Sequence, residues 1–283
     1  MADVLLASAR DLIKPDLDTP LLEAALAARG VDVRTAPWDD ETAGWDGAAL
    51  VAIRSTWDYF DRRPEFVDWV DQVAAATRLV NPADVVRWNS AKTYLADLGA
   101  KGVPILPTAF LSHGADADLQ AEALAGFDAE VVVKPAVGGG ARGALRAPAG
   151  SPEAAAHVAD LVTTGDVLVQ PYEPTVAVGE DSLIFLGGVF SHAVRKVPAA
   201  GDYRVQEQYG GTVAPIEPTY LQEQVAAAVL AAVPAQLAYA RVDLVRPGEP
   251  ALMELEVIEP ELFLRLDPPS AGRLADHLVG LLG

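Results

Sequence analysis

Three acidic side chains near the carboxyl terminus have the spacing of a divalent-metal site. Asp243 lies in the segment RVDLV, Glu254 and Glu256 lie in LMELEVI, and the turn-forming sequence RPGEP separates them. Both segments alternate apolar and polar residues, which is typical of β-strands, so they predict a hairpin. Residues two apart share a strand face, and a register symmetric about Gly248 and Glu249 places Asp243 opposite Glu254.

Carboxylates held this close repel one another and raise each other's pKa unless a cation lies among them. Mg²⁺ binds a few carboxylates together with phosphate oxygens and water, so we expect one or two Mg²⁺ ions here, with Mn²⁺ also compatible. On this expectation Leu252 and Ile258 share the face of the glutamates, while Met253, Leu255 and Val257 face the core. The alternative is a solvated acidic face in an acidic protein.

A lysine directly before a glycine-rich loop is the second candidate for phosphate chemistry. The segment VVVKPAVGGGARG places Lys134 on an expected strand, and Gly138, Gly139 and Gly140 follow it. A Walker A loop has its lysine after the glycines, at the start of a helix, so this is a different arrangement. A lysine on a strand can hold phosphates from one side while a flexible loop closes over them. The alternative is a surface lysine before an ordinary loop.

The segment HAVRKVPAAGDYRVQEQYGG supplies positive charge to a chain with a net charge of −19. Such an acidic chain opposes binding to nucleic acid, and an anionic ligand needs a local basic cluster. Arg195, Lys196 and Arg204 provide one, because a guanidinium group fits phosphate or carboxylate oxygens. The alternative is ordinary surface ion pairing, which contributes little free energy.

Patterns along the chain predict the elements that position these groups. Residues 3–9, 31–38 and 49–60 indicate strands of a parallel sheet, and the sequence after the last strand could line a site at residues 54–59. Asn89 and Ser90 predict the cap of a helix that carries Lys92. The further elements expected are helices at 19–30, 65–76, 117–124, 152–162 and 220–237, strands at 107–111, 130–135 and 166–172, a hairpin at 182–197, and a terminal helix.

Together these features resemble the ATP-grasp ligases. The segments that carry the resemblance are RSTWDY, WNSAKTYL, GVPILPT, VVVKPAVGGGARG, SHAVRKVP, GDYRVQEQYGG and MELEVIEPELFL. The chain is similar to the glutathione synthetase and D-alanine ligase branch, and particularly to cyclo-ligases of the cycloserine-biosynthesis type, which act on O-ureido-serine. The resemblance implies an α/β ATP-grasp fold with a Rossmann-like amino-terminal domain at 1–88, a small α+β lid domain at 89–170 and a carboxyl-terminal α+β domain at 171–283.

The resemblance also implies roles for particular residues. The residues implied to bind ATP are Lys92, Lys134, Gly138, Gly139, Gly140, Gln170, Pro171, Tyr172 and Glu180. The implied catalytic residues are Arg204, Lys196 and Arg195, and the implied metal ligands are Asp243, Glu254 and Glu256. Two positions depart from the family pattern. Glu256 stands where many members have Asn, and Glu261 stands where a small residue is expected and could contact the acceptor substrate.

The activity implied is that of an ATP-dependent carbon–nitrogen ligase. It phosphorylates a carboxylate or carbonyl oxygen of a small amino-acid-like substrate, joins it to a nitrogen of another molecule or of the same one, and releases ADP and phosphate. A small-molecule kinase and a catalytically degenerate ATP-binding module are the alternatives. Substrate specificity is expected at residues 54–59 and 204–211.

Composition limits the remaining possibilities. Cysteine is absent, which excludes a disulfide framework, a thiol nucleophile and a cysteine metal site. The start lacks a signal peptide and no apolar run is long enough to span a bilayer, so we expect a cytoplasmic protein without membrane or nucleic-acid partners. A homo-oligomer is compatible with the sequence. The four histidines lack metal-site spacing, His192 indicates a structural residue, and Ser55 lacks the context of a hydrolase nucleophile.

Overall fold

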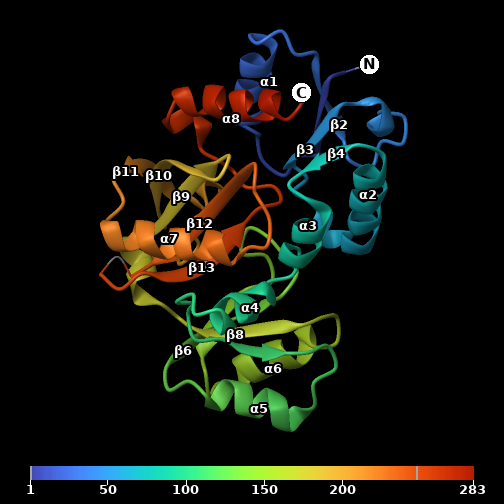
Figure 1. Ribbon diagram of the computed structural model, residues 1–283. Coiled ribbons are helices and arrows are strands. Elements are labelled where there is room, and N and C mark those ends of the chain that lie inside the picture. The colour runs from blue at the N-terminus through green and yellow to red at the C-terminus, as the bar shows by residue number, and fades with distance from the viewer. Residues whose placement is uncertain (1, 247) are drawn as a thin grey trace.

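The chain folds into lobes that each contain one β-sheet (Figure 1). The computed structural model describes residues 2–246 and 248–283, and within these residues the strands form three sheets. Figure 1 shows the blue amino-terminal lobe at one end, the green and yellow lobe at the other, and the orange sheet between them. The sheets occupy consecutive stretches of sequence, as the α/β patterns predict.

A parallel sheet with strand order β2-β1-β3-β4 forms the amino-terminal lobe. Its strands are β1 (Val4–Ser8), β2 (Val33–Pro37), β3 (Leu50–Ser55) and β4 (Arg78–Val80). Its helices are α1 (Thr19–Ala27), α2 (Arg63–Ala76) and α3 (Ala83–Asn89). Every residue of β1 and β3 is buried, because α1 covers one face of the sheet and α2 the other, which explains their largely apolar sequences.

An antiparallel sheet with strand order β5-β8-β6-β7 forms the central lobe. Its strands are β5 (Ala109–Leu111), β6 (Glu130–Pro135), β7 (Leu145–Pro148) and β8 (Val167–Pro171). Its helices are α4 (Tyr94–Ala100), α5 (Ala117–Ala125) and α6 (Pro152–Leu161). Helices α5 and α6 begin where the side chains of Asp116 and Ser151 accept hydrogen bonds from the first turn, and both pack on one face of this sheet.

Lys92 lies in the turn between α3 and α4 and not on a helix, contrary to the prediction. Asn89 ends α3 and does not cap a new helix, because its side chain binds the carboxyl-terminal lobe. Its amide nitrogen donates to the carbonyl of Leu255 and its amide oxygen accepts from the N–H of Val257. The turn is fixed by a hydrogen bond of 2.7 Å from the N–H of Lys92 to the carbonyl of Ala136.

The carboxyl-terminal sheet is antiparallel, with strand order β11-β10-β9-β12-β13. Its strands are β9 (Glu180–Leu186), β10 (Val189–Val197), β11 (Thr212–Ile216), β12 (Tyr239–Val245) and β13 (Ala251–Glu256). Helix α7 (Tyr220–Ala232) packs on it through Ala226 and Val229. The helix ends five residues before the predicted Leu237, because Pro234 cannot continue it and disfavours helical backbone in the residue before it.

The last helix, α8 (Pro269–Gly280), packs against α1 and joins the core of the amino-terminal lobe. Leu274 and Leu278 share a buried cluster with Leu22 and Leu26, and Figure 1 shows the red helix beside the blue one. The chain therefore returns to its first lobe. The boundary predicted between residues 88 and 89 falls within α3, and that between 170 and 171 falls within β8.

Short 3-10 turns complete the described secondary structure. They lie at Trp45–Gly47, Tyr59–Asp61, Pro174–Val178, Glu207–Tyr209 and Leu264–Leu266. None of the helices within residues 2–246 and 248–283 combines the length and apolar character needed to cross a bilayer.

Candidate active site

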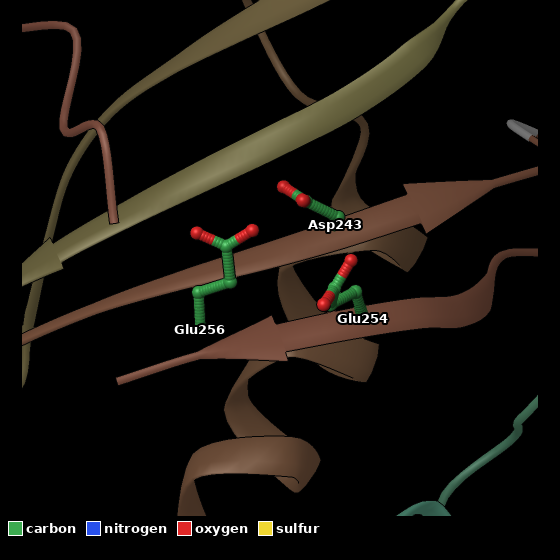
Figure 2. Close-up of side chains that lie close together, drawn as sticks. All are labelled: Asp243, Glu254 and Glu256. Atoms are coloured by element: carbon green, nitrogen blue, oxygen red, sulfur yellow. The ribbon is translucent and has the colours of Figure 1, made fainter. Parts of the chain in front are cut away.

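The acidic hairpin has the predicted register at its functional residues. Asp243 of β12 pairs with Glu254 of β13, and Arg241 pairs with Glu256. Figure 2 shows the carboxylates of Asp243, Glu254 and Glu256 on the same side of the two strands. One oxygen from each lies within 4.8 Å of one oxygen from each of the others. This spacing and this set of hard oxygen donors fit a divalent cation.

A bulge in the hairpin changes the predicted faces of two residues. The register shifts between Asp243 and Leu244, so that Leu244 pairs with Leu252 and Met253 is the extra residue of β13. Leu252 therefore lies in the core with Leu255, contrary to the prediction. Met253, which was expected in the core, lines the cavity described below.

Each of these three acids is paired with a basic side chain. Asp243 accepts hydrogen bonds from Lys196 at 3.0 Å and from Arg241 at 2.9 Å, and its other oxygen accepts from Ser182 at 2.6 Å. Glu256 accepts from Arg241 at 2.6 Å, and Glu254 lies 3.1 Å from the ammonium of Lys92. Phosphate groups compete for the same cations, so a bound nucleotide would free these carboxylates for a metal.

The pKa values of the acids separate in a way that also suits the binding of a cation among them. Burial would raise the pKa of Asp243, but the charges of Arg241 and Lys196 outweigh it and lower the pKa. Burial raises the pKa of Glu256 to about 7, because repulsion from Glu254 and Asp243 offsets the attraction of Arg241. Burial and repulsion from Glu256 likewise raise the pKa of Glu259 to about 8.

A cavity of about 230 Å³ opens beside the hairpin, where the lobes meet. It is lined from the amino-terminal lobe by Lys14, Trp57 and Phe60, and from the other lobes by most of the predicted residues. The predicted site residues that line it are Lys92, Lys134, Gly138, Gly139, Gly140, Gln170, Pro171, Tyr172, Glu180, Lys196, Arg204, Asp243, Glu254 and Glu256.

Arg195 does not line this cavity. It precedes Lys196 on β10, and successive side chains of a strand point to opposite faces, so the two cannot both reach the site. Its guanidinium forms two hydrogen bonds of 2.7 and 2.8 Å with the buried carboxylate of Asp181 instead. The prediction that Arg195 acts with Lys196 is corrected to a structural ion pair.

Arg241 is a basic residue of the site that was not predicted from the sequence. It is buried, its guanidinium binds Asp243 and Glu256 at the same time, and it lines the cavity. The signal was present in the segment RVDLV, because residues two apart on a strand share a face. Arg241 stands two residues before Asp243, so the two side chains lie on the same face of the strand.

Two lysines face the hairpin from the central part of the chain. Lys134 lies on β6, and burial lowers its pKa to about 8, although the charge of Glu254 opposes this shift. Lys92 donates a hydrogen bond to the carbonyl of Gly138 and so connects the glycine loop with Glu254. Anionic phosphates bound between these lysines and the hairpin would stabilise the charged form of Lys134 and raise its pKa again.

Several apolar side chains also line the cavity. Leu106, Val132, Val176 and Met253 line it beside the end of β8. Gln170 is held there by a hydrogen bond of 2.9 Å from its amide to the hydroxyl of Thr108. A flat heterocycle fits such an apolar slot, and its attached phosphates would extend towards the lysines.

The glycine loop touches both neighbouring lobes. Arg142 lies 2.9 Å from Asp61, and a Cβ atom on Gly139 would lie 3.1 Å from the ring of Phe60, so glycine permits this close approach. On the other side, the hydroxyl of Tyr209 donates to the carbonyl of Gly140 at 3.2 Å, and that of Tyr203 to the carbonyl of Ala144 at 3.1 Å. The loop is thus part of a cover over the cavity.

The predicted specificity segments contribute unequally to the cavity. Within residues 54–59, Trp57 is the residue that lines the cavity. Arg54 is buried, and Tyr59 packs in an aromatic cluster. In residues 204–211, the lining part is 204–208. Arg204 is bound to Asp202 at 2.7 Å and stacks over the ring of Tyr209.

His192 is structural, as the sequence indicates. Its ring contacts the carbonyl of Leu262 at 2.9 Å, burial lowers its pKa, and it does not line the cavity. Ser55 is buried outside the cavity and has no catalytic histidine among its described hydrogen-bond partners.

Comparisons with known proteins agree with this architecture. Residues 4–81 match the N-terminal domain of D-cycloserine synthetase DcsG, and residues 107–267 match the ATP-grasp domain of prokaryotic glutathione synthetase. The cycloserine biosynthesis protein DcsG of Streptomyces lavendulae is 36% identical over 291 aligned positions, which cover 93% of each chain. The crystal structure of D-cycloserine synthetase DcsG has a TM-score of 0.90 and 34% identity over 99% of each chain.

A D-alanine–D-alanine ligase from Bacillus anthracis shares the fold, with a TM-score of 0.71 at 14% identity over 100% of this chain and 97% of that one. Fold and site together define a member of the ATP-grasp class. Within that class, the chain belongs to the family of ATP-grasp ligases that includes DcsG. The predicted fold and enzyme class are therefore confirmed, and the protein is an ATP-dependent ligase.

Proposed function

We propose that this ligase activates the carboxylate of a small amino-acid-like substrate and closes it into a ring on a nitrogen atom of the same molecule. The observation that carries the ligase chemistry is the single cavity in which Lys92 and Lys134 face the acidic hairpin. Ring closure is supported by the likeness to DcsG, which extends through the amino-terminal lobe that lines the substrate end.

The proposed reaction has two balanced steps. In the first, an oxygen of the substrate carboxylate attacks the γ-phosphorus of ATP, the bond to the β,γ-bridging oxygen breaks, and ADP leaves. In the second, the nitrogen lone pair attacks the acyl carbon, a C–N bond forms, and phosphate leaves with the former carboxylate oxygen. The nitrogen loses one proton, which restores its neutral state. No covalent bond to the protein is needed.

The side chains contribute position and charge. Lys92 and Lys134 would bind the phosphates, while Arg241 and Lys196, released from their acids, would stabilise the transferring group. Asp243, Glu254 and Glu256 would hold the metal, which neutralises phosphate charge when bound. The cover formed by the glycine loop and the tyrosines would keep water from the acyl phosphate.

Several finer points belong to this proposal. The metal is Mg²⁺, with one or two ions per site, because phosphate-binding sites usually hold this ion through few carboxylates. A carboxylate oxygen of Glu180 lies 2.5 Å from the ammonium nitrogen of Lys196. Glu180 would therefore contact the nucleotide only after this ion pair breaks. We also propose the absence of nucleic-acid partners, on the grounds of the acidic charge, while a cytoplasmic location, the absence of membrane partners and a homo-oligomer stay predictions.

Joining two separate molecules is the second candidate, since the fold is shared with a D-alanine–D-alanine ligase. Mass spectrometry of products formed with ATP and Mg²⁺ from amino acids and their O-substituted serine derivatives separates the candidates. Ring closure yields a product that retains a single substrate skeleton and contains the new C–N bond. Joining yields a product of two substrates less one water. A stable phosphorylated product would indicate a kinase, and absence of ADP release across the panel would contradict the proposal.

A further inference from the structure

The segment after β13 lines the cavity through Glu259, Glu261 and Phe263, and side chains from other elements hold its backbone. We call residues 259–264 the strap. The indole of Trp57 donates to the carbonyl of Glu259 at 3.1 Å, and Arg54 donates to the carbonyl of the next residue, Pro260, at 3.0 Å. Arg241 then donates to the carbonyl of Glu261 at 3.2 Å. Three consecutive carbonyl groups of the strap are thus fixed from outside it.

The far half of the strap is held in the same way. The buried carboxylate of Asp18 accepts hydrogen bonds from the N–H of Leu262 at 2.5 Å and from the N–H of Leu264 at 2.8 Å. A segment that is anchored at five of its backbone groups has little freedom to move. The strap therefore presents its two acidic side chains, which both line the cavity, in fixed positions.

These two acids differ in how their charge is balanced. Both oxygens of Glu261 are occupied, one by Lys14 at 2.5 Å and the other by Arg265 at 2.6 Å. In the described part of the chain, by contrast, no basic nitrogen lies within 4.0 Å of the carboxylate of Glu259. Glu259 also lies outside the group of acids whose oxygens come within 4.8 Å of one another. The cluster that suits a metal therefore does not include it.

A carboxylate that is largely withdrawn from water, rigidly placed and unpaired is costly, unless a ligand brings a compensating cation. Glu259 lines the cavity together with Trp57 and Lys14, and it also lines a smaller neighbouring cavity with Lys92. A small molecule that offers its carboxylate to the phosphates would occupy the same cavity as the phosphates. Its cationic group would be an aliphatic ammonium, which is compact and donates several hydrogen bonds.

We propose that Glu259 binds the ammonium group of the substrate and selects amino-acid-like molecules over analogues that lack the amine. This inference rests on the proposed function for the class of substrate. It assigns the strap a role in specificity: Trp57, Arg54 and Arg241 fix the backbone that carries the selecting carboxylate.

Calorimetric binding to the protein with Mg²⁺ and ADP tests the inference with two pairs of probes. D-cycloserine is compared with isoxazolidin-3-one, and D-serine with 3-hydroxypropanoate; each pair differs only in the amine. We expect wild-type protein to prefer the amine by about tenfold or more in at least one pair, the range for a hydrogen bond between charged groups. Glu259→Gln should lose that preference and bind the amine-free partner no more weakly than wild type does.

Glu223→Gln is the matched control, because Glu223 is exposed on α7, and it should keep the preference. Retained ADP and Mn²⁺ binding in Glu259→Gln would show an intact fold and metal site. The inference is overturned if wild type shows no preference for the amine in either pair, if Glu259→Gln keeps it, or if that variant loses a bound Mn²⁺ ion. ADP release without amine selectivity would leave the proposed ligase standing, whereas absence of ADP release would count against the ligase itself.

Discussion

At the scale of single residues, basic side chains with similar ion pairs have different roles. Arg241 and Arg195 both bind buried aspartates through two nitrogens, yet only Arg241 lines the cavity. The local chemistry of the two pairs is similar. Their faces of the sheet differ, and this decides which one can meet a phosphoryl group.

Replacing each arginine with lysine tests this division, because lysine keeps the charge and loses the fork. We expect Arg241→Lys to lower kcat for ADP release by about tenfold to a hundredfold, since the forked donor geometry that would stabilise the transferring group is lost. Arg195→Lys should leave kcat within about twofold and reduce the free energy of unfolding by about 1 kcal/mol, as its ion pair is partly exposed. Equal effects on kcat would contradict the assignment.

The sequence predicts much of the site at this scale. The period of two in β12 and β13 places Asp243, Glu254 and Glu256 together, and the pairing confirms this. The same period applied to RVDLV and to Arg195 with Lys196 would have found Arg241 and rejected Arg195. The side-chain pairs that join distant segments, such as Lys92 with Glu254, follow from packing between lobes and not from local pattern.

At the scale of elements, the site depends on local departures from regular structure. The bulge at Met253 turns an apolar side chain into the cavity, and the turn between α3 and α4 brings Lys92 under the glycine loop. Neither departure has a sequence signal as clear as the strands themselves. Asn89 looks like a helix cap, but its amide instead pairs with the backbone of Leu255 and Val257.

The cover over the cavity offers a test at this scale. Tyr203 and Tyr209 each donate one hydrogen bond to the segment that begins with the glycines, and a neutral hydrogen bond contributes about 1 kcal/mol. We expect the double variant Tyr203→Phe, Tyr209→Phe to open the cover more often. Hydrolysis of the activated intermediate should rise, so that ADP forms in several-fold excess over ligated product.

Quantifying ADP and product in the same reaction measures this coupling. Tyr220→Phe is the control, because Tyr220 is 72% exposed on α7, and its ratio of ADP to product should equal that of wild type. A double variant that stays fully coupled would show that these hydroxyl groups do not hold the cover.

At the scale of the molecule, three sheets of the described chain are arranged so that their edges and loops meet at one cavity. The succession of patterns along the chain predicts the sheets in order. That order does not predict that α8 packs against α1. Leu22 and Leu26 lie near one end of the chain and Leu274 and Leu278 near the other, and they meet in one buried cluster. Local pattern shows that α8 has an apolar face, and packing decides its partner.

In the proposed function, lysines of one lobe and carboxylates of another form a single site for ATP and its metal. Calorimetric titration with ATP, first with Mg²⁺ and then with a chelator, tests this most directly. We predict that chelation weakens ATP binding to wild type by about tenfold or more, that Glu254→Gln largely removes this dependence on metal, and that Lys134→Met weakens binding in both conditions. ATP affinity that is unaltered in both variants would contradict the account.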